Sequence, residues 1–222
     1  MLLAIDTSTA QIGLALYDGS VIPGELIWQS RAHQTEQLAP AVEGLLERVG
    51  VTMNALSVIG VAIGPGSFTS LRVGLAFVKG LALARHLALI GIPTLDIVAA
   101  CVPPVDRRLA AVVQAGRGRL AVGWYKPTAD GWQASGKAIT MTADELEEKI
   151  HRPVIVCGEL TAADRQCLRR KFKKVVLATP AQCVRRPGIL AEIAWKRWQA
   201  GDTDEPASLS PIYLHVAGGL PA

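Results

Sequence analysis

The chain has 222 residues, of which 50% are hydrophobic and 19% are charged, so it can bury one large core or two smaller ones. Lys and Arg number 23 against 19 Asp and Glu, and the formal net charge of +4 permits a polyanion as partner without requiring one. The four cysteines share no CxxC spacing. This excludes a disulfide-stapled secreted scaffold and favours reduced thiols.

The N-terminal stretch MLLAIDTSTA contains no basic region and only a short apolar run before Asp6, so it predicts neither a signal peptide nor a membrane anchor. The most apolar stretch, residues 75–92, is interrupted by Lys79, Arg85 and His86 and does not have the pattern of a membrane span. We therefore expect a cytoplasmic protein.

The first elements in chain order are two apolar runs, Leu2–Ile5 and Gln11–Tyr17, which flank a polar turn and predict a β-hairpin. A third strand is expected at residues 26–30. The next segment predicts a helix that ends at Gly50, with Pro40 as a kink or a late start. Its apolar stripe consists of Leu38, Val42, Leu45, Leu46 and Val49.

A buried strand is predicted at Val58–Ile63, and after a glycine-rich turn a helix is predicted from Ser67 to His86. This helix is apolar around nearly its whole circumference, so we expect it to be covered on more than one side. Small residues recur along it at Ala76, Gly80 and Ala84, which predicts close packing against another segment.

The second half repeats the order of elements of the first. After a strand at 90–93, a helix at 95–101 ends at Pro103-Pro104, where we expect a lobe boundary. A second hairpin is predicted at 109–115 and 120–125, and further strands at 132–139, 154–157 and 175–178. Three more helices are predicted: one opened by a capping box at Thr142, a basic helix at 161–171 and a helix at 187–200.

This order is that of the α/β actin-like ATPase (ASKHA) fold, which has two lobes, each with a mixed β-sheet flanked by helices. We expect a first lobe at residues 1–102, a smaller second lobe at 103–206 and a tail at 207–222 that docks on the body.

Two short motifs have the composition of phosphate-binding turns. Hydroxyls and backbone N–H groups in such turns can hold a phosphate, and an Asp can position a metal-bound water. Both turns can equally be structural, with Asp and Thr capping local backbone groups. We expect structure first and phosphate second. The candidate residues are Asp6, Thr7, Ser8, Gly64, Gly66 and Ser67.

No nucleophile with a paired base stands out, so no catalytic residue is predicted. The four histidines, His33, His86, His151 and His215, lack the spacing of metal ligands, and no metal site is predicted. A basic run could meet RNA phosphates, although a solvated helix face is the more common explanation. It comprises Arg165, Arg169, Arg170, Lys171, Lys173 and Lys174.

Four segments together resemble one family: AIDTSTAQIGLAL (4–16), RAHQTEQLAPAVEGLL (31–46), IGPGSFTSLRVGLAFVKGLA (63–82) and GIPTLDIVAA (91–100). They resemble TsaB (YeaZ), the non-catalytic paralogue of TsaD in tRNA threonylcarbamoyladenosine biosynthesis. The third segment is the most specific. The match becomes weak after residue 100.

The resemblance implies a scaffold that is not an enzyme by itself. It would bind TsaD as a heterodimer and activate it for threonylcarbamoyl transfer to the adenosine next to the anticodon of tRNA. TsaE would join the pair, the chain alone would form a homodimer, and tRNA would be met only indirectly. No cofactor of its own is implied, while a nucleotide at the interface with TsaD stays open. The implied interface residues are Leu38, Val42, Leu45, Leu71, Leu75, Ala76, Lys79, Gly80 and Leu83.

Two departures from related patterns bear on activity. TsaD carries a metal-binding HxxxH pair where this chain has TLDIVAAC (94–101), which argues against metal-dependent transfer and against a peptidase. The TsaB family usually has an Asp-Ala-Arg-Arg-Gly-Glu turn where this chain has Gln-Ala-Gly-Arg-Gly-Arg (114–119), without either carboxylate. An active small-molecule kinase or ATPase of the actin-like fold remains the alternative.

Overall fold

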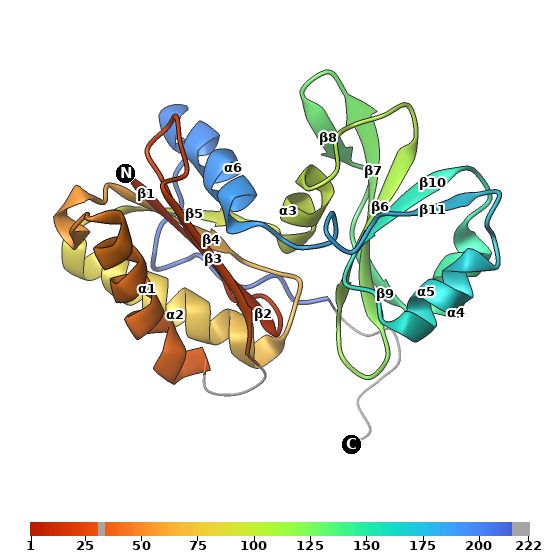
Figure 1. Cartoon of the computed structure of the whole chain (residues 1–222), viewed down its shortest axis with the longest axis horizontal. Helices are drawn as coiled ribbons and strands as arrows, with labels where there is room; N and C mark the ends of the chain where they lie inside the picture. Colours follow the sequence, from red (N-terminus) through yellow and green to blue (C-terminus); the bar gives the residue numbers. More distant parts are fainter. Residues whose placement is uncertain (31–33, 215–222) are drawn as a thin grey trace. The chain divides into compact units, whose positions relative to one another are not determined.

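The structure is a computed structural model that describes residues 1–30 and 34–214. The chain divides into two compact units (Figure 1). The first comprises Met1–Thr94 and Arg186–Ile212, and the second comprises Leu95–Arg185 and the described residues from Tyr213 on.

The first unit contains a five-stranded mixed sheet in the order β3-β2-β1-β4-β5. The hairpin pairs β1 with β2 and β2 with β3 antiparallel, whereas β4 and β5 extend the sheet in parallel. Its strands are β1 (Leu2–Asp6), β2 (Gln11–Tyr17), β3 (Gly24–Gln29), β4 (Val58–Ala62) and β5 (Ala88–Ile92).

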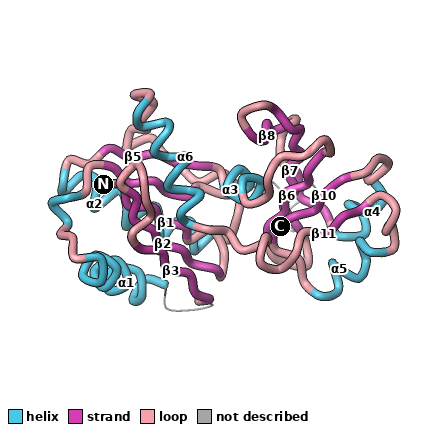
Figure 2. The backbone as a smooth tube through the Cα atoms, turned by 45° about the horizontal axis from the view of Figure 1, so that its top comes forward, coloured by secondary structure: helices cyan, strands magenta, loops and turns pink. Residues whose placement is uncertain are grey.

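Helices cover both faces of this sheet (Figure 2). On one face, α1 (Gln34–Val49) and α2 (Phe68–Arg85), with the short 3₁₀ turn η1 (Met53–Ala55) before β4, enclose the main core around Leu3 and Ile5. On the other face lies α6 (Pro187–Gln199), so close that a Cβ on Gly60 would be 2.7 Å from the Cβ of Ala194. The unit therefore has three layers.

The second unit repeats the sheet order, as β11-β10-β6-β7-β8, with β9 pairing with β7. Its helix α3 (Thr94–Ala100) covers one face, and α4 (Ala143–Lys149) and α5 (Ala162–Arg169) cover the other. Its strands are β6 (Arg108–Gln114), β7 (Leu120–Thr128), β8 (Gly131–Ala134), β9 (Ile139–Met141), β10 (Val154–Gly158) and β11 (Val175–Leu177). The predicted repetition of element order is confirmed.

The lobe boundaries differ from those predicted at residues 102 and 206. Leu95 and Val98 of α3 belong to the core of the second unit, so the boundary lies at Thr94 and not at the two prolines. Helix α6 belongs to the first unit because its residues pack on β1, β2, β4 and β5. Proline pairs end helices, but which sheet a helix covers depends on its apolar contacts.

Two local expectations were also wrong. The strand predicted at 132–139 is interrupted at Gly136, whose φ of 85° lies in the left-handed region, and is two strands that pair with different parts of β7. Pro40 lies inside a helix that begins at Gln34, so the late start is wrong, while the alternative of a kink stays a prediction. The capping box at Thr142 and the helix from Ser67 to His86 are confirmed, with Ser67 as N-cap and His86 as C-cap.

The tail up to Ile212 contacts the first unit, where the N–H of Ile212 donates to the carbonyl oxygen of Ile63 at 2.7 Å, whereas Leu214 packs against a core cluster of the second unit. Residues 215–222, and with them the rest of the predicted docking tail, lie outside the described residues, as do Arg31–His33 of the second family segment. Within the described residues, no helix combines the length and apolar character that a membrane crossing requires.

Candidate functional site

The turn between β1 and β2 is buried and bonded to itself. Asp6 ends β1 with only 1% of its surface exposed, and its Oδ1 accepts the backbone N–H of Ser8 at 2.8 Å. This bond closes a short loop of the kind that Asp forms two residues ahead of itself. The turn thus has a local structural reason for its Asp.

The structure brings this turn against the glycine-rich turn that precedes α2. The N–H of Ser67 donates to the carbonyl oxygen of Ser8 at 2.7 Å, and a Cβ on Gly66 would lie 2.1 Å from that oxygen. The hydroxyls of Ser8 and Thr94 are hydrogen-bonded at 2.8 Å, and the N–H of Gly64 donates to the Thr94 hydroxyl at 3.0 Å. All six candidate phosphate-motif residues therefore meet at one junction.

Helix α2 is fixed to the same junction through Thr7. The Thr7 hydroxyl donates to the carbonyl oxygen of Ser70 at 2.9 Å, and a Cβ on Gly74 would lie 2.0 Å from the Thr7 Oγ1. The hydroxyls of Thr7 and Ser8 and the N–H of Ser67 thus have partners within the chain. This bonding supports the structural interpretation of both turns, and phosphate binding there stays a prediction.

The outward face of α2 carries the small-residue strip. Ala76, Gly80 and Ala84 are exposed, and nothing lies within 4 Å of the position that a Cβ on Gly80 would occupy. Beside them, Leu83 exposes 65% of its surface. The predicted close packing is therefore absent among the described residues, and the strip is left uncovered on that part of the chain.

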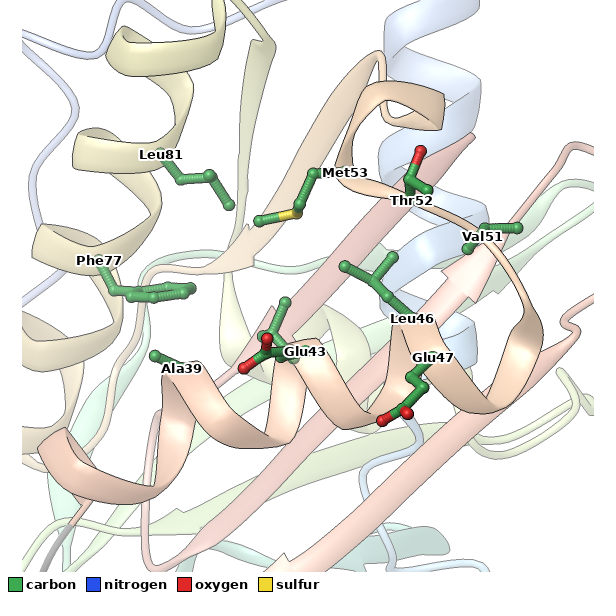
Figure 3. A pocket seen from close by; sticks show the side chains of 10 residues that line it. Ala39, Glu43, Leu46, Glu47, Val51, Thr52, Met53, Phe77 and Leu81 are labelled. Carbon is green, nitrogen blue, oxygen red and sulfur yellow. The ribbon is translucent and has the colours of Figure 1, made fainter.

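A groove of about 560 Å³ runs between α1, η1 and α2 (Figure 3). The side chains of Phe77 and Leu81 on α2 face Met53 across it, and Glu43 and Glu47 of α1 stand at its edge. Its lining is completed by Ala39, Val42, Leu46, Val51 and Thr52. The groove is apolar within and acidic along one side.

Five residues implied as a partner interface are almost wholly buried, although Val42 also lines the groove. They are between 1% and 6% exposed because they form the inner faces of α1 and α2 over the sheet; these residues are Leu38, Val42, Leu45, Leu71 and Leu75. Ala76, Lys79, Gly80 and Leu83 are accessible. Sequence reasoning missed Phe77, Leu81 and Met53, although the apolar circumference of α2 indicated that it has a second apolar face.

The second unit holds two thiols close together, those of Cys157 and Cys183. The half-buried Cys183 sulfur accepts N–H groups from Gly158 at 3.4 Å and from Arg165 at 3.3 Å. A hydrogen bond from Cys157, followed by these donors, lowers the pKa of Cys183 to about 6, while the same bond and burial raise the pKa of Cys157. The described residues contain no group of three His, Cys, Asp or Glu that could hold a metal ion.

The family model described as TsaD, tRNA N6-adenosine threonylcarbamoyltransferase, matches residues 7–196. The chain is 31% identical to the tRNA threonylcarbamoyladenosine biosynthesis protein TsaB of Bacillus subtilis (strain 168), over 97% of this chain and 94% of that protein. The chain belongs to the TsaB (YeaZ) family.

Solved structures agree with this TsaB fold. YeaZ from Pseudomonas aeruginosa superposes with a TM-score of 0.76 at 21% identity, covering 96% of this chain and 99% of that one. The ROK hexokinase from Thermus thermophilus superposes with a TM-score of 0.50 at 10% identity, covering 90% and 99%. At these identities the likeness shows the fold alone, and the predicted actin-like fold is confirmed.

A substitution at Gly74 tests the junction that orients α2. Gly74→Ala places a methyl group on Thr7 and breaks its buried hydrogen bond, so we expect a loss of about 2–4 kcal/mol in the free energy of unfolding. Gly80→Ala is the control, because its Cβ enters open space and should stabilise the helix by up to about 1 kcal/mol. Urea unfolding of both variants measures the difference. Equal stability would contradict the packing described.

The second prediction concerns thiol reactivity. Iodoacetamide modification followed by mass spectrometry between about pH 5 and 9 should show Cys183 reacting with an apparent pKa near 6, well before Cys167, whose pKa burial raises to about 11. Arg165→Met should move the Cys183 profile upward, toward the ordinary thiol value of about 8.5. A wild-type Cys183 profile already at that ordinary value would show that neither the Cys157 hydrogen bond nor the N–H donors stabilise the thiolate.

Proposed function

We propose that this chain is a non-catalytic subunit that binds TsaD and activates it for threonylcarbamoyl transfer to the adenosine next to the anticodon of tRNA. The proposal rests on family membership and on one observation, the uncovered small-residue strip of α2. The binding site would be the outward surface of α2, formed by Ala76, Lys79, Gly80, Leu83 and Ala84, which we call the α2 surface.

A helix with exposed glycine and alanine in line allows another helix to approach its backbone closely. Without a Cβ at Gly80, the distance between helix axes can fall toward the short end of the 8–10 Å range. Contiguous exposed apolar side chains such as Leu83 favour coverage by another protein. Both features fit a helix-on-helix interface better than a small-molecule site.

The groove between α1 and α2 adds specificity to such an interface. Its apolar floor would accept a large side chain, and Glu43 and Glu47 at its edge would favour a partner that carries Lys or Arg beside that side chain. In this proposal TsaE joins the pair afterwards, and in the absence of TsaD a second copy of the chain covers the same α2 surface.

The internal bonding of the β1–β2 turn supports a binding role over catalysis. In an active kinase of this fold the corresponding hydroxyls would be available to a nucleotide phosphate, whereas here Thr7 donates to Ser70 and Ser8 bonds with Thr94. A kinase or ATPase would instead be indicated if about 1 mM ATP raised the melting temperature of the isolated chain.

The test is formation of threonylcarbamoyladenosine on tRNA in a reconstituted mixture of the cognate TsaC-type enzyme, TsaD, TsaE, ATP, threonine and bicarbonate. We expect product only when this chain is added. Gly80→Leu should weaken pairing with TsaD, measured by titration calorimetry, at least about tenfold, because a bulky side chain holds the partner helix away.

The control variant is Ala134→Trp, which adds bulk at an exposed position on β8 of the second unit and should leave pairing unchanged. Normal pairing of Gly80→Leu, or product formed equally without this chain, would overturn the proposal. Circular dichroism of both variants establishes that any loss does not come from unfolding.

A further inference from the structure

Charge is divided unequally between the two units. Residues 95–185 carry fifteen Lys and Arg against nine Asp and Glu, a formal +6, whereas residues 1–94 and 186–212 carry eight against ten, a formal −2. The net positive charge of the chain therefore resides in the second unit, away from the sequence that forms the α2 surface. A polyanionic partner would be attracted to this unit.

Six of its charged and aromatic residues are consecutive and begin at the last residue of α5. We call this segment the basic turn: Arg169, Arg170, Lys171, Phe172, Lys173 and Lys174. Only its first residue belongs to the helix, so the basic run is not the solvated face of a longer helix that sequence reasoning favoured. It leads directly into β11.

The backbone of the basic turn is held in place. The N–H groups of Lys174 and Val175 donate to the carbonyl oxygen of Lys171 at 2.7 and 2.9 Å, and the carbonyl oxygen of Lys174 accepts the N–H of Val154 at 2.8 Å. Lys171 itself is anchored, since its Nζ donates to the carbonyl oxygen of Glu147 at 2.6 Å. The turn is therefore ordered before any ligand arrives, which lowers the entropic cost of binding.

The cations of the turn differ in what they contact. Arg170 lies 3.4 Å from the Asp144 carboxylate in an exposed pair, which contributes little. For Arg169, Lys173 and Lys174, by contrast, the described residues supply no carboxylate within ion-pair distance, and all three are exposed. Three cations within six residues are thus available to an external anion.

An aromatic ring lies among these cations. Phe172 exposes 73% of its surface, the largest fraction among the exposed large hydrophobic side chains of the described residues, and the Lys173 Nζ lies 5.8 Å from the ring centroid. The ring borders a shallow depression of about 180 Å³ that residues 170–174 line. A ring exposed to this extent buries little apolar area in the fold, but it offers a face for stacking.

We propose that the basic turn binds RNA directly, with Arg169, Lys173 and Lys174 on backbone phosphates and an unpaired base stacked on Phe172. The combination of free cations and an exposed ring is that of single-stranded RNA sites, in which phosphate contacts supply affinity and stacking tolerates any base. A membrane surface fits less well, because membrane-bound helices present a wide apolar face, whereas α5 has only eight residues and its exposed positions carry two alanines, a glutamine and an arginine.

The choice of tRNA as the RNA rests on the proposed function in tRNA modification. The sequence had favoured only indirect contact with tRNA. Two observations now favour direct contact with tRNA. Phe172 is exposed, and three cations have no ion-pair partner among the described residues.

The experiment measures binding of the full chain to a fluorescently labelled tRNA transcript by anisotropy. With about three phosphate contacts, affinity should fall roughly 30-fold between about 50 and 200 mM salt. Arg169→Glu with Lys173→Glu should weaken binding at the lower salt at least about tenfold and flatten the salt dependence. Phe172→Ala should weaken binding about fivefold or more and leave the salt slope unchanged.

A matched control carries the same change in net charge elsewhere on the second unit. Lys126→Glu with Lys137→Glu alters two exposed lysines of the β7–β8 region and should bind the tRNA nearly as well as wild type. Equal losses in both double variants would mean that only net charge matters and would overturn the site. Binding of the wild-type chain to phosphatidylglycerol vesicles but not to tRNA would overturn it in favour of a membrane surface.

Pairing with TsaD separates this proposal from the proposed function. The Arg169→Glu/Lys173→Glu variant should pair with TsaD normally while losing tRNA, whereas Gly80→Leu should lose TsaD and keep tRNA. Loss of TsaD pairing in the first variant would show that the basic turn contacts the protein partner and would overturn the assignment to RNA.

Discussion

The contact on which the first unit depends is the approach of α2 to the β1–β2 turn. The Thr7 hydroxyl donates to the carbonyl oxygen of Ser70 in α2, and the space beside it admits only a glycine at position 74. These two contacts restrict the position and orientation of the helix over the sheet. Ser67 caps the N-terminus of α2, and the nearby hydroxyl of Ser8 is hydrogen-bonded to that of Thr94. The outward strip of α2 is therefore presented by a rigid helix, as an interaction surface requires.

This junction also gives the predicted phosphate motif a structural role in a chain proposed to be non-catalytic. The Asp, hydroxyls and glycines that serve a phosphate in enzymes of this fold are here engaged with one another. Their residue types are constrained by packing, because a side chain on Gly66 would strike the backbone of Ser8. The packing of this chain therefore accounts for the glycine at position 66 without a bound phosphate.

Much of the fold could be predicted because local signals and tertiary packing agree. Hydrophobic period, capping residues and turn glycines gave α2 and the β1–β2 hairpin nearly to the residue. Lobe membership of α3 and α6 could not be predicted, since it depends on which sheet their apolar sides meet. The same limit applies to the predicted interface residues. An apolar stripe such as Leu38 and Leu45 identifies the core face of a helix, whereas the outward face is identified only by the positions of the packed elements.

The placement of α6 sets the order in which the chain can fold during synthesis. The first sheet is complete once Ile92 has been made, but the face around Gly60 stays uncovered until α6, which ends at Gln199, has left the ribosome. The second unit, apart from the end of the chain, is a continuous segment that finishes at Arg185. The unit encoded second can therefore close before the unit encoded first, and the nascent first sheet is the part that would need a chaperone's protection.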